Sequence, residues 1–359
     1  MTLPRRVVPF LFALVVVGTS SAAETPKDAN DFKRTDVVPA PTLKFNAERN
    51  QIYCDTMAHA WNVLGEVKVF DRALPLKLKG QSNWSDALND VDPYFFDVPS
   101  PDRFAMAGMK KDDIVDKINQ GLQGKFGSDA PKVAVNLLRP DDILAYAYLF
   151  KNLEFAKPFE DVDLDYWDEK THVPAPIKSF GIGLFKAGSK GQASIASQIR
   201  IHDSSYSHTV VELRPKDYAK RYDTIILLKV NDAKPTLKEM IDEAVASVKG
   251  DGDDFVPNSG LRVPVIGLNI RKNYAEMVKP IVHSDYSIAA AIHDIKFVLN
   301  KEGALLKSSG TIMVTRGGGP RNYQFDPPFL VILAQKTPKG LKAYFAAWIA
   351  NDELLEPAL

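Results

Sequence analysis

A series of apolar, strand-like runs, most of them in the second half of the chain, constrains the fold more than any other feature. The runs lie at residues 143–150, 224–230, 261–270, 292–300, 329–334 and 343–350. Helical periodicity is found in fewer segments, at residues 50–66, 112–122, 235–248 and 273–281. Helices are expected mainly in the first half and strands in the second, without regular alternation. The pattern therefore predicts an α+β fold rather than a series of βαβ units.

Composition places the chain among ordinary globular proteins. Of its 359 residues, 45% are hydrophobic and 25% are charged. Lysine plus arginine equals aspartate plus glutamate at 45 each, and no basic stripe is interleaved with aromatic residues. We therefore expect neither nucleic acid nor an anionic membrane surface as a partner. Cys54 is the only cysteine, so no internal disulfide can form and the core must hold the fold.

The first residues have the pattern of a secretory signal peptide. Arg5 and Arg6 precede an apolar run over residues 7–17, and Ser21 and Ala23 are small at the positions that a signal peptidase reads. The sequence predicts a signal peptide over residues 1–23, a disordered tail over 24–42 and a single domain over 43–359. The protein would then be secreted, extracellular or periplasmic, and free of the membrane after cleavage. An uncleaved anchor is the alternative.

Motifs for enzyme chemistry are weak. The sequence contains no G-x-S-x-G elbow and no phosphate-binding loop with its lysine. His202 and His208 could share a metal only in a folded-back loop, and the aspartates of residues 251–254 fit a turn better than a calcium loop. Cys54 is expected to be a buried structural cysteine. We predict no cofactor and no metal, with a metal-dependent enzyme as the least favoured alternative.

The most informative segment surrounds the stretch IMVTRGGGPRNYQF, residues 312–325. IHDIKFVLNKEGA before it and FDPPFLVILAQKTPKGLKAYFAAWI after it resemble the serpin family. In serpins a strand ends in an acidic-glycine hinge, an exposed reactive-centre loop follows, and the chain returns through an F-x-x-PF strand. His293 matches the histidine before the strand. Lys301, Glu302, Gly303 and Ala304 match the hinge, and Phe325, Pro328 and Phe329 match the return strand.

Weaker matches follow in the same order upstream, at residues 118–126, 145–159, 171–181, 223–230 and 261–281. The resemblance implies a divergent, secreted member of bacterial type. It also implies helices in the N-terminal half around large mixed or antiparallel sheets, with the reactive loop exposed near the C-terminus. Phe155 stands where the family has tryptophan, and Cys54-Asp55 stands where it has Ser-Pro. Residues 66–112 are fewer than a serpin uses there, so the sheet that receives the loop is expected to be trimmed.

The resemblance implies a suicide inhibitor, whose cleaved loop inserts as a new strand and drags the acyl-linked protease away. An inserted strand requires alternation, because every second residue faces the core. The core-facing set would be small or apolar: Ala304, Leu306, Ser308, Gly310, Ile312 and Val314. Lys307, the charge in this stretch, falls on the other face, where it can stay in water. The pattern therefore permits insertion.

The bait bond is expected at Arg316-Gly317. A gapless alignment gives Gly317 as the bait residue, but Arg316 can pair with the acidic pocket of a trypsin-like serine protease. We therefore predict such a protease as the target of a monomeric inhibitor. One alternative is that the glycines only form a flexible connector. Another is a non-inhibitory serpin-fold binding or structural protein, because the bulk of Leu305 and Leu306 would slow insertion.

Overall fold

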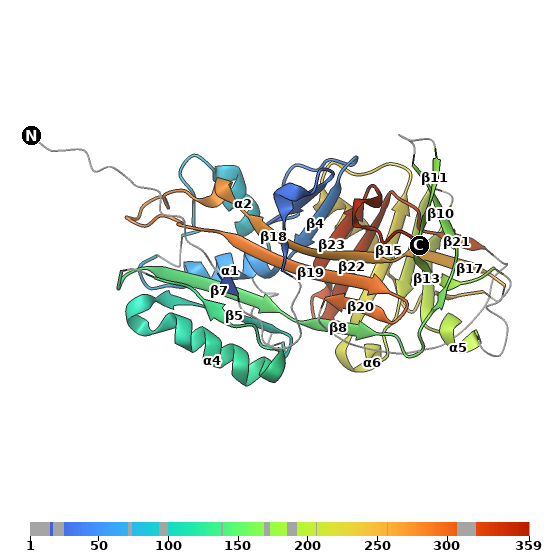
Figure 1. Cartoon of the computed structure of the whole chain (residues 1–359), viewed down its shortest axis with the longest axis horizontal. Coiled ribbons are helices and arrows are strands. Elements are labelled where there is room, and N and C mark those ends of the chain that lie inside the picture. The colour runs from blue at the N-terminus through green and yellow to red at the C-terminus, as the bar shows by residue number, and fades with distance from the viewer. Residues whose placement is uncertain are drawn as a thin grey trace, which may run out of the picture.

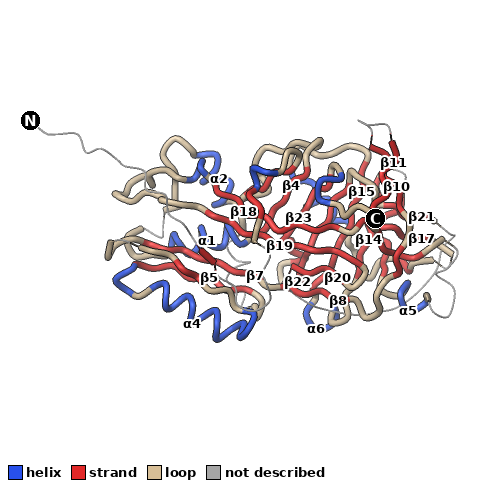
Figure 2. Tube along the Cα trace, viewed as in Figure 1, coloured by secondary structure: helices blue, strands red, loops and turns tan. Residues whose placement is uncertain are grey.

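The computed structural model describes the greater part of the chain. The described residues are 15–16, 25–70, 74–92, 100–137, 139–168, 173–184, 192–205, 207–256, 258–306 and 321–358. Figure 1 shows an elongated molecule with α1 (Thr56–Gly65), α2 (Ser82–Asn89) and α4 (Ile114–Phe126) gathered at one end. Strands make up most of the remainder (Figure 2). This confirms the predicted α+β class.

An eight-stranded sheet forms the centre of the molecule. Its strands, in spatial order, are β16 (Asp253–Asp254), β13 (Ile199–Ser204), β14 (His208–Leu213), β15 (Asp223–Val230), β22 (Phe329–Thr337), β23 (Gly340–Ile349), β4 (Asn50–Cys54) and β3 (Thr35–Val38). Neighbouring strands are antiparallel except β3 and β4, which are parallel. Both faces of β15 are buried: Ile225 and Leu227 face one hydrophobic cluster, and Ile226 and Leu228 face another. Double-sided burial explains why these strands read as continuous apolar runs.

Helix α7 (Leu237–Ser247) covers one face of this sheet, and a second sheet covers the other. Thr236 begins α7 with a capping box, in which its hydroxyl accepts from Glu239 N–H and the Glu239 carboxylate accepts from Thr236 N–H. The second sheet has five strands in the order β2 (Lys27–Asp28), β18 (Ile266–Asn273), β19 (Ile292–Asn300), β20 (Gly303–Leu306) and β8 (Lys151–Glu154). Phe297 from β19 and Phe345 from β23 pack on each other across the interface, with ring centroids 4.4 Å apart and ring planes tilted by 34°.

Smaller sheets complete the fold. A four-stranded sheet has the order β21 (Asn322–Gln324), β17 (Gly260–Pro264), β12 (Ser179–Ile182), β9 (Glu160–Asp161). Three strand pairs are β5 (Arg103–Met109) with β7 (Ile143–Leu149), β10 (Leu164–Asp168) with β11 (Val173–Ile177), and β1 (Val15–Val16) with β6 (Val133–Ala134). Helix α4 packs Ile118 and Leu122 against the pair formed by β5 and β7.

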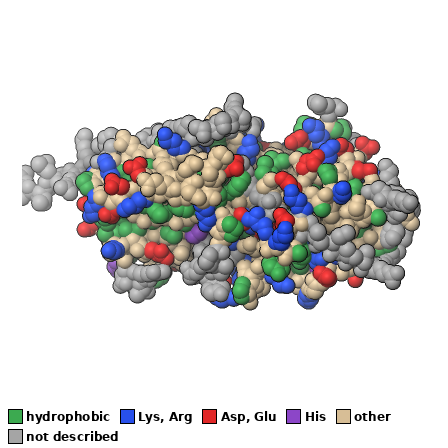
Figure 3. All heavy atoms as spheres, turned by 90° about the horizontal axis from the view of Figure 1, so that it is seen from below, with side chains coloured by type: hydrophobic (Ala, Val, Ile, Leu, Met, Phe, Trp, Pro, Cys, Tyr) green, Lys and Arg blue, Asp and Glu red, His purple; other side chains and the backbone are tan. Residues whose placement is uncertain are grey.

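The other helical elements are short. They are α5 (Ala193–Ala196), α6 (Tyr218–Arg221) and the 3-10 turns η1 (Ala29–Asp31), η2 (Lys110–Asp112), η3 (Gly127–Asp129), η4 (Ala275–Met277) and η5 (Asp352–Leu354). Among the described helices, none combines the length and apolar character needed to cross a membrane. Charged side chains of both signs are spread over the face shown in Figure 3, in agreement with the balanced composition.

Most strand predictions are confirmed, and residues 292–300 coincide with β19. The run at 261–270 is divided at Val265 between β17 and β18, which belong to different sheets. The helix predicted over 50–66 begins only at Thr56, because residues 50–54 form β4 and pair with β23. The helix predicted over 273–281 is reduced to the single turn η4.

The predicted solvated tail over residues 24–42 also differs from the structure. Residues 35–38 form β3, the edge strand beside β4. Ala29, Val37 and Ala40 are buried, which anchors the segment to the core. Polar composition misled the prediction, because a short edge strand needs only a few apolar side chains on its inner face.

The interface between the two large sheets leads to a stability prediction. Phe345→Ala removes a fully buried ring that packs on Phe297, and should lower the free energy of unfolding by about 3–5 kcal/mol. Urea unfolding followed by circular dichroism measures this loss. Asn83→Ala, on the exposed side of α2, is the control and should change stability by no more than about 0.5 kcal/mol. A loss below about 1 kcal/mol for Phe345→Ala would contradict a tightly packed interface.

Candidate functional site

The predicted hinge lies in a tight connection between β19 and β20. Lys301 and Glu302 form the turn, and their carbonyl oxygens accept hydrogen bonds from the N–H groups of Phe159 and Phe155, both at 2.9 Å. The Lys301 ammonium also pairs with Asp161 at 2.5 Å. These contacts join the turn to the segment after β8, so the hinge is anchored to that segment.

Beyond the turn, the chain enters the five-stranded sheet as an interior strand, next to the edge strand β8. Residues 303–306 form β20, which pairs antiparallel with β19 on one side and β8 on the other. Ala304 lies opposite Leu299 and Leu153, and Leu306 lies opposite Lys151. Ala304 and Leu306 face the core and are 1% and 5% exposed, whereas Leu305 on the other face is only half-buried.

Gly303 is required where β20 begins. Its φ of +146° lies in a region that side-chain-bearing residues avoid. A Cβ atom at this position would come within 2.1 Å of the Leu153 carbonyl oxygen. The glycine therefore lets the backbone of β20 approach β8 closely enough to pair.

The two strands that flank β20 have different partners beyond Leu306. In the described part of the chain, residues 292–297 of β19 pair only with β18. On the other side, β7 precedes β8 in the chain and pairs only with β5. Figure 1 shows β7 and β8 in series, with β19 beside them. If β20 were extended beyond Leu306, it would run between β19 and β7. Each of these two strands has an edge on that side without a described partner.

A buried hydrogen-bonded chain ties β19 to the start of α1. His293 Nε2 lies 2.7 Å from Thr56 Oγ1, and His293 Nδ1 lies 3.3 Å from the Tyr274 hydroxyl. The Thr56 hydroxyl donates to Cys54 Sγ at 3.5 Å. One arrangement of protons satisfies all three contacts: Tyr274 donates to Nδ1, Nε2–H donates to Thr56, and Thr56 donates to the sulfur. Neutral His293 therefore links strand and helix.

Burial determines the protonation states of these hydrogen-bonded side chains. It lowers the pKa of His293 to about 4, so the imidazole is neutral near pH 7. Burial also raises the pKa of Cys54 to about 12, which keeps the sulfur as a thiol. A thiol of this kind is inert, as expected of a structural cysteine.

A second buried cluster lies beside β20 and was missed by sequence reasoning. The Lys151 ammonium is fully buried, contacts Asp223, and lies 3.1 Å from Asp102. Arg221 also contacts Asp102. Burial opposes ionisation of Asp102, but Lys151 and Arg221 together hold its pKa below the usual range. The sequence feature that could have revealed this cluster is a charged residue within an apolar run, as in YLFKN and YDTIIL.

The remaining predicted site residues divide into two groups. Ser308, Gly310, Ile312, Val314, Arg316 and Gly317 lie outside the described residues. The histidine candidates hydrogen-bond to carboxylates, His202 to Glu212 and His208 to Asp203, and the aspartate candidates form ion pairs, Asp251 with Arg214 and Asp254 with Arg200. Within the described ranges, no three His, Cys, Asp or Glu residues come together in a way that could hold a metal ion.

Comparison with known proteins yields structural neighbours only. No protein-family model matches the chain, and no curated protein matches it. A tumour-suppressing serpin has a TM-score of 0.48 at 11% identity, over 84% of this chain and 92% of its own. A serpin of the trematode Schistosoma haematobium has 0.46 at 9%, over 86% and 94%. Manduca sexta serpin-12 has 0.42 at 13%, over 86% and 94%. Similarity at this level assigns neither a family nor an activity.

Steric contact at Gly303 predicts a local change in the sheet. Gly303→Ala should expel β20 from its place beside β8, because the new Cβ meets the Leu153 carbonyl. Hydrogen exchange of the peptide covering residues 303–306 should accelerate by about tenfold or more, since its amides lose their partners. Gly124→Ala, where nothing lies within 4 Å of the added Cβ, is the matched control. Unchanged exchange in Gly303→Ala would contradict the pairing.

The depressed pKa of His293 predicts a pH dependence of stability. Its folded value of about 4 lies below the ordinary value of 6.5, so the unfolded state binds the proton more readily between these values. This histidine therefore lowers the free energy of unfolding as pH falls from 7 towards 4. His59, also lowered to about 4 by burial, acts in the same direction, and Asp55, raised to about 6, acts in the opposite one.

A comparison of variants isolates the contribution of His293. Urea unfolding at pH 7.5 and pH 5 should show a smaller loss of stability for His293→Asn than for the wild type, because the amide does not titrate. His283→Asn is the control, since His283 is exposed and its left-handed φ of 62° suits asparagine. Equal losses in His293→Asn and the wild type would contradict this account.

Proposed function

We propose that the chain is a secreted serpin-like inhibitor of serine proteases, with residues 307–320 as a cleavable loop and Arg316-Gly317 as the bait bond. The observation that carries the proposal is the position of β20. The last two hinge residues, Gly303 and Ala304, already pair inside the five-stranded sheet, between β19 and β8. Beyond them, β19 and β7 present edges that have no partner among the described residues.

The register of β20 supports the insertion of the following residues. Continuing it by two positions would put Ser308 between Ile295 and Leu149, both of which face the core. Two positions further, Gly310 would meet buried His293, where a residue without a side chain fits. Each added pair would contribute backbone hydrogen bonds to edges that have no partner among the described residues.

The register also implies that one contact would slow insertion. Lys307 would come opposite Lys296 on the outer face of the sheet, and like charges directly across two strands are unfavourable. The penalty is modest because both side chains can reach water. Insertion is therefore slowed rather than prevented, as the bulk of Leu305 also implies.

The proposed inhibition uses the protease's own chemistry. The serine hydroxyl oxygen of the protease attacks the Arg316 carbonyl carbon, and the Arg316-Gly317 peptide bond breaks. The amine of Gly317 leaves with the proton that the protease transfers, and an ester joins Arg316 to the serine. Insertion of residues 307–315 would then carry the acyl-enzyme away before water can hydrolyse the ester.

One observation favours a second candidate, a non-inhibitory protein of the same fold that serves in binding or as a structural component. Residues 303–306 are paired in the uncleaved chain, with Ala304 and Leu306 already buried. The pairing and burial of these residues therefore already contribute to the uncleaved state, and that part of the free energy of insertion would not be released on cleavage. In this candidate, the loop is cut without trapping the protease.

Gel electrophoresis of the mature chain with a trypsin-like protease tests the proposal. The wild type should form a complex that survives denaturation and has the combined mass of the protease and the N-terminal inhibitor fragment. Arg316→Ala should abolish this complex by removing the charge that the specificity pocket recognises. Arg321→Ala, a nearby arginine beyond the glycines, is the matched control and should leave the complex intact.

The thermal unfolding midpoint before and after cleavage separates the two candidates. Cleavage within residues 307–320 should raise the midpoint in an inhibitor, because the freed strand fills the sheet. Complete cleavage with the protease still active and the midpoint unchanged would overturn the inhibitory proposal and support the non-inhibitory one.

A further inference from the structure

The buried amine of Lys151 lies between two aspartates, where the two large sheets meet. Lys151 belongs to β8 in the five-stranded sheet, and Asp223 begins β15 in the eight-stranded one. Both side chains are fully buried, the Lys151 ammonium contacts Asp223, and it lies 3.1 Å from Asp102. The ring of Tyr344 covers the ammonium, with its centroid 4.9 Å away. The proposed inhibition uses none of these side chains.

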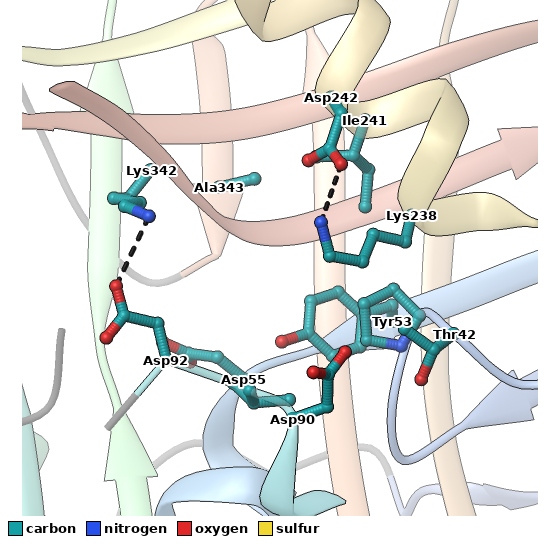
Figure 4. A pocket seen from close by; sticks show the side chains of 12 residues that line it. Thr42, Tyr53, Asp55, Asp90, Asp92, Lys238, Ile241, Asp242, Lys342 and Ala343 are labelled. Carbon is teal, nitrogen blue, oxygen red and sulfur yellow. Dashed lines mark hydrogen bonds and ion pairs between the residues drawn. The ribbon is translucent and has the colours of Figure 1, made fainter. Parts of the chain in front are cut away.

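Two other Lys–Asp pairs show how such a pair behaves at the surface. Figure 4 shows Lys238 with Asp242 at 2.6 Å and Lys342 with Asp92 at 3.3 Å. Their side chains are between 36% and 60% exposed. They line a pocket of about 280 Å³, together with Asp55 and Asp90. Water solvates both ions of an exposed pair, so the ammonium keeps its proton and is not a nucleophile.

Burial changes this balance for Lys151 and Asp223. A site of low dielectric constant penalises both charges, and transfer of one proton from the ammonium to the carboxylate removes the penalty. Burial raises the pKa of Asp223 against the opposing charge of Lys151, and the negative charge of Asp102 adds to the rise. The neutral amine is the nucleophilic form of lysine, and the neutral carboxyl group is the electrophilic form of aspartate. The fold therefore places the two reactive forms side by side.

Asp102 is placed to move protons between the two groups. It lies just before β5, with one carboxylate oxygen 3.1 Å from Lys151 Nζ and the other in contact with Arg221. Burial opposes its ionisation, but Lys151 and Arg221 hold its pKa below the usual range. Asp102 is therefore a carboxylate that can accept a proton from the amine. The contact with Arg221 fixes its orientation.

We propose that Lys151 and Asp223 form an intramolecular amide bond, with Asp102 as the acid–base catalyst. Lys151 Nζ attacks Asp223 Cγ, a C–N bond forms, one C–O bond of the carboxyl group breaks, and one water leaves. Two protons pass in turn from the nitrogen to the leaving oxygen through Asp102, which ends as the carboxylate it was. The ammonium and carboxylate charges disappear together, so no co-reactant is needed. Fixed proximity and the removal of two buried charges favour the bond.

This bond would do what a disulfide does in other proteins. Cys54 is the only cysteine, so the chain cannot form an internal disulfide. An amide between residues 151 and 223 would join the two large sheets covalently and close a long loop of chain, which restricts the unfolded state. It would also fix β8 next to β20, because Lys151 pairs with Leu306. The strand beside the hinge would then be anchored to the core.

Mass spectrometry of the denatured, mature chain tests the proposal. The wild type should be lighter than its sequence by one water, about 18 Da. After digestion with trypsin, the segments that contain residues 151 and 223 should appear as one branched peptide, and the chain should stay uncut after Lys151 because its amine is acylated. A wild-type mass equal to that of the mature sequence would overturn the proposal. A water loss that maps elsewhere, for example to Asp251-Gly252, would overturn it too.

Variants identify the groups that react. Lys151→Arg keeps the positive charge but cannot form the amide, so its mass should equal that of its sequence. Asp102→Asn should lower the crosslinked fraction by about tenfold or more, because the amide side chain cannot accept the proton. Crosslinking as complete as in the wild type would overturn the role of Asp102. Lys238→Arg, at an exposed pair, is the matched control and should keep the water loss. If Lys151→Arg does not fold, the branched peptide of the wild type decides alone.

Discussion

Burial of β15, β22 and β23 on both faces is the constraint on which the rest of the structure depends. The chain has one cysteine, so no disulfide supplements its core. One face of these strands packs on α7, and the other packs on the five-stranded sheet that carries β19 and β20. Because the central strands are covered on both sides, the second sheet has a fixed platform, and the hinge at Gly303 is held relative to the core.

The five-stranded sheet combines a firmly held part with an incomplete one. Residues 303–306 are paired on both sides, whereas the adjoining stretches of β19 and β7 each have one partner in the described structure. Buried polar groups lie below both parts: Lys151 with its two aspartates beside Leu306, and His293 with Thr56 and Tyr274 further along. Each has partners from distant segments, so the sheet is positioned by specific polar contacts as well as by apolar packing.

Sequence reasoning succeeded where periodicity and burial have a local cause. Residues 292–300 alternate between core and solvent, and β19 follows that alternation over its whole length. It failed where tertiary contacts overrode local preference. Residues 50–54 read as the start of a helix, yet they form β4 because β23 and β3 offer partners on both sides. Residues 261–270 read as one strand, yet Val265 leaves the ladder and lets β17 and β18 join different sheets.

The sequence by itself determined the α+β class and most strand positions. These features follow from side-chain alternation and backbone conformation, which act over a few residues. Only the tertiary structure decided that β20 lies between β19 and β8, and that Asp55 shares a pocket with Asp90 and Lys342. Such pairings join residues far apart in the chain. Which residues pair depends on which surfaces remain to be buried once the core has formed. The local periodicity of the sequence does not contain this information.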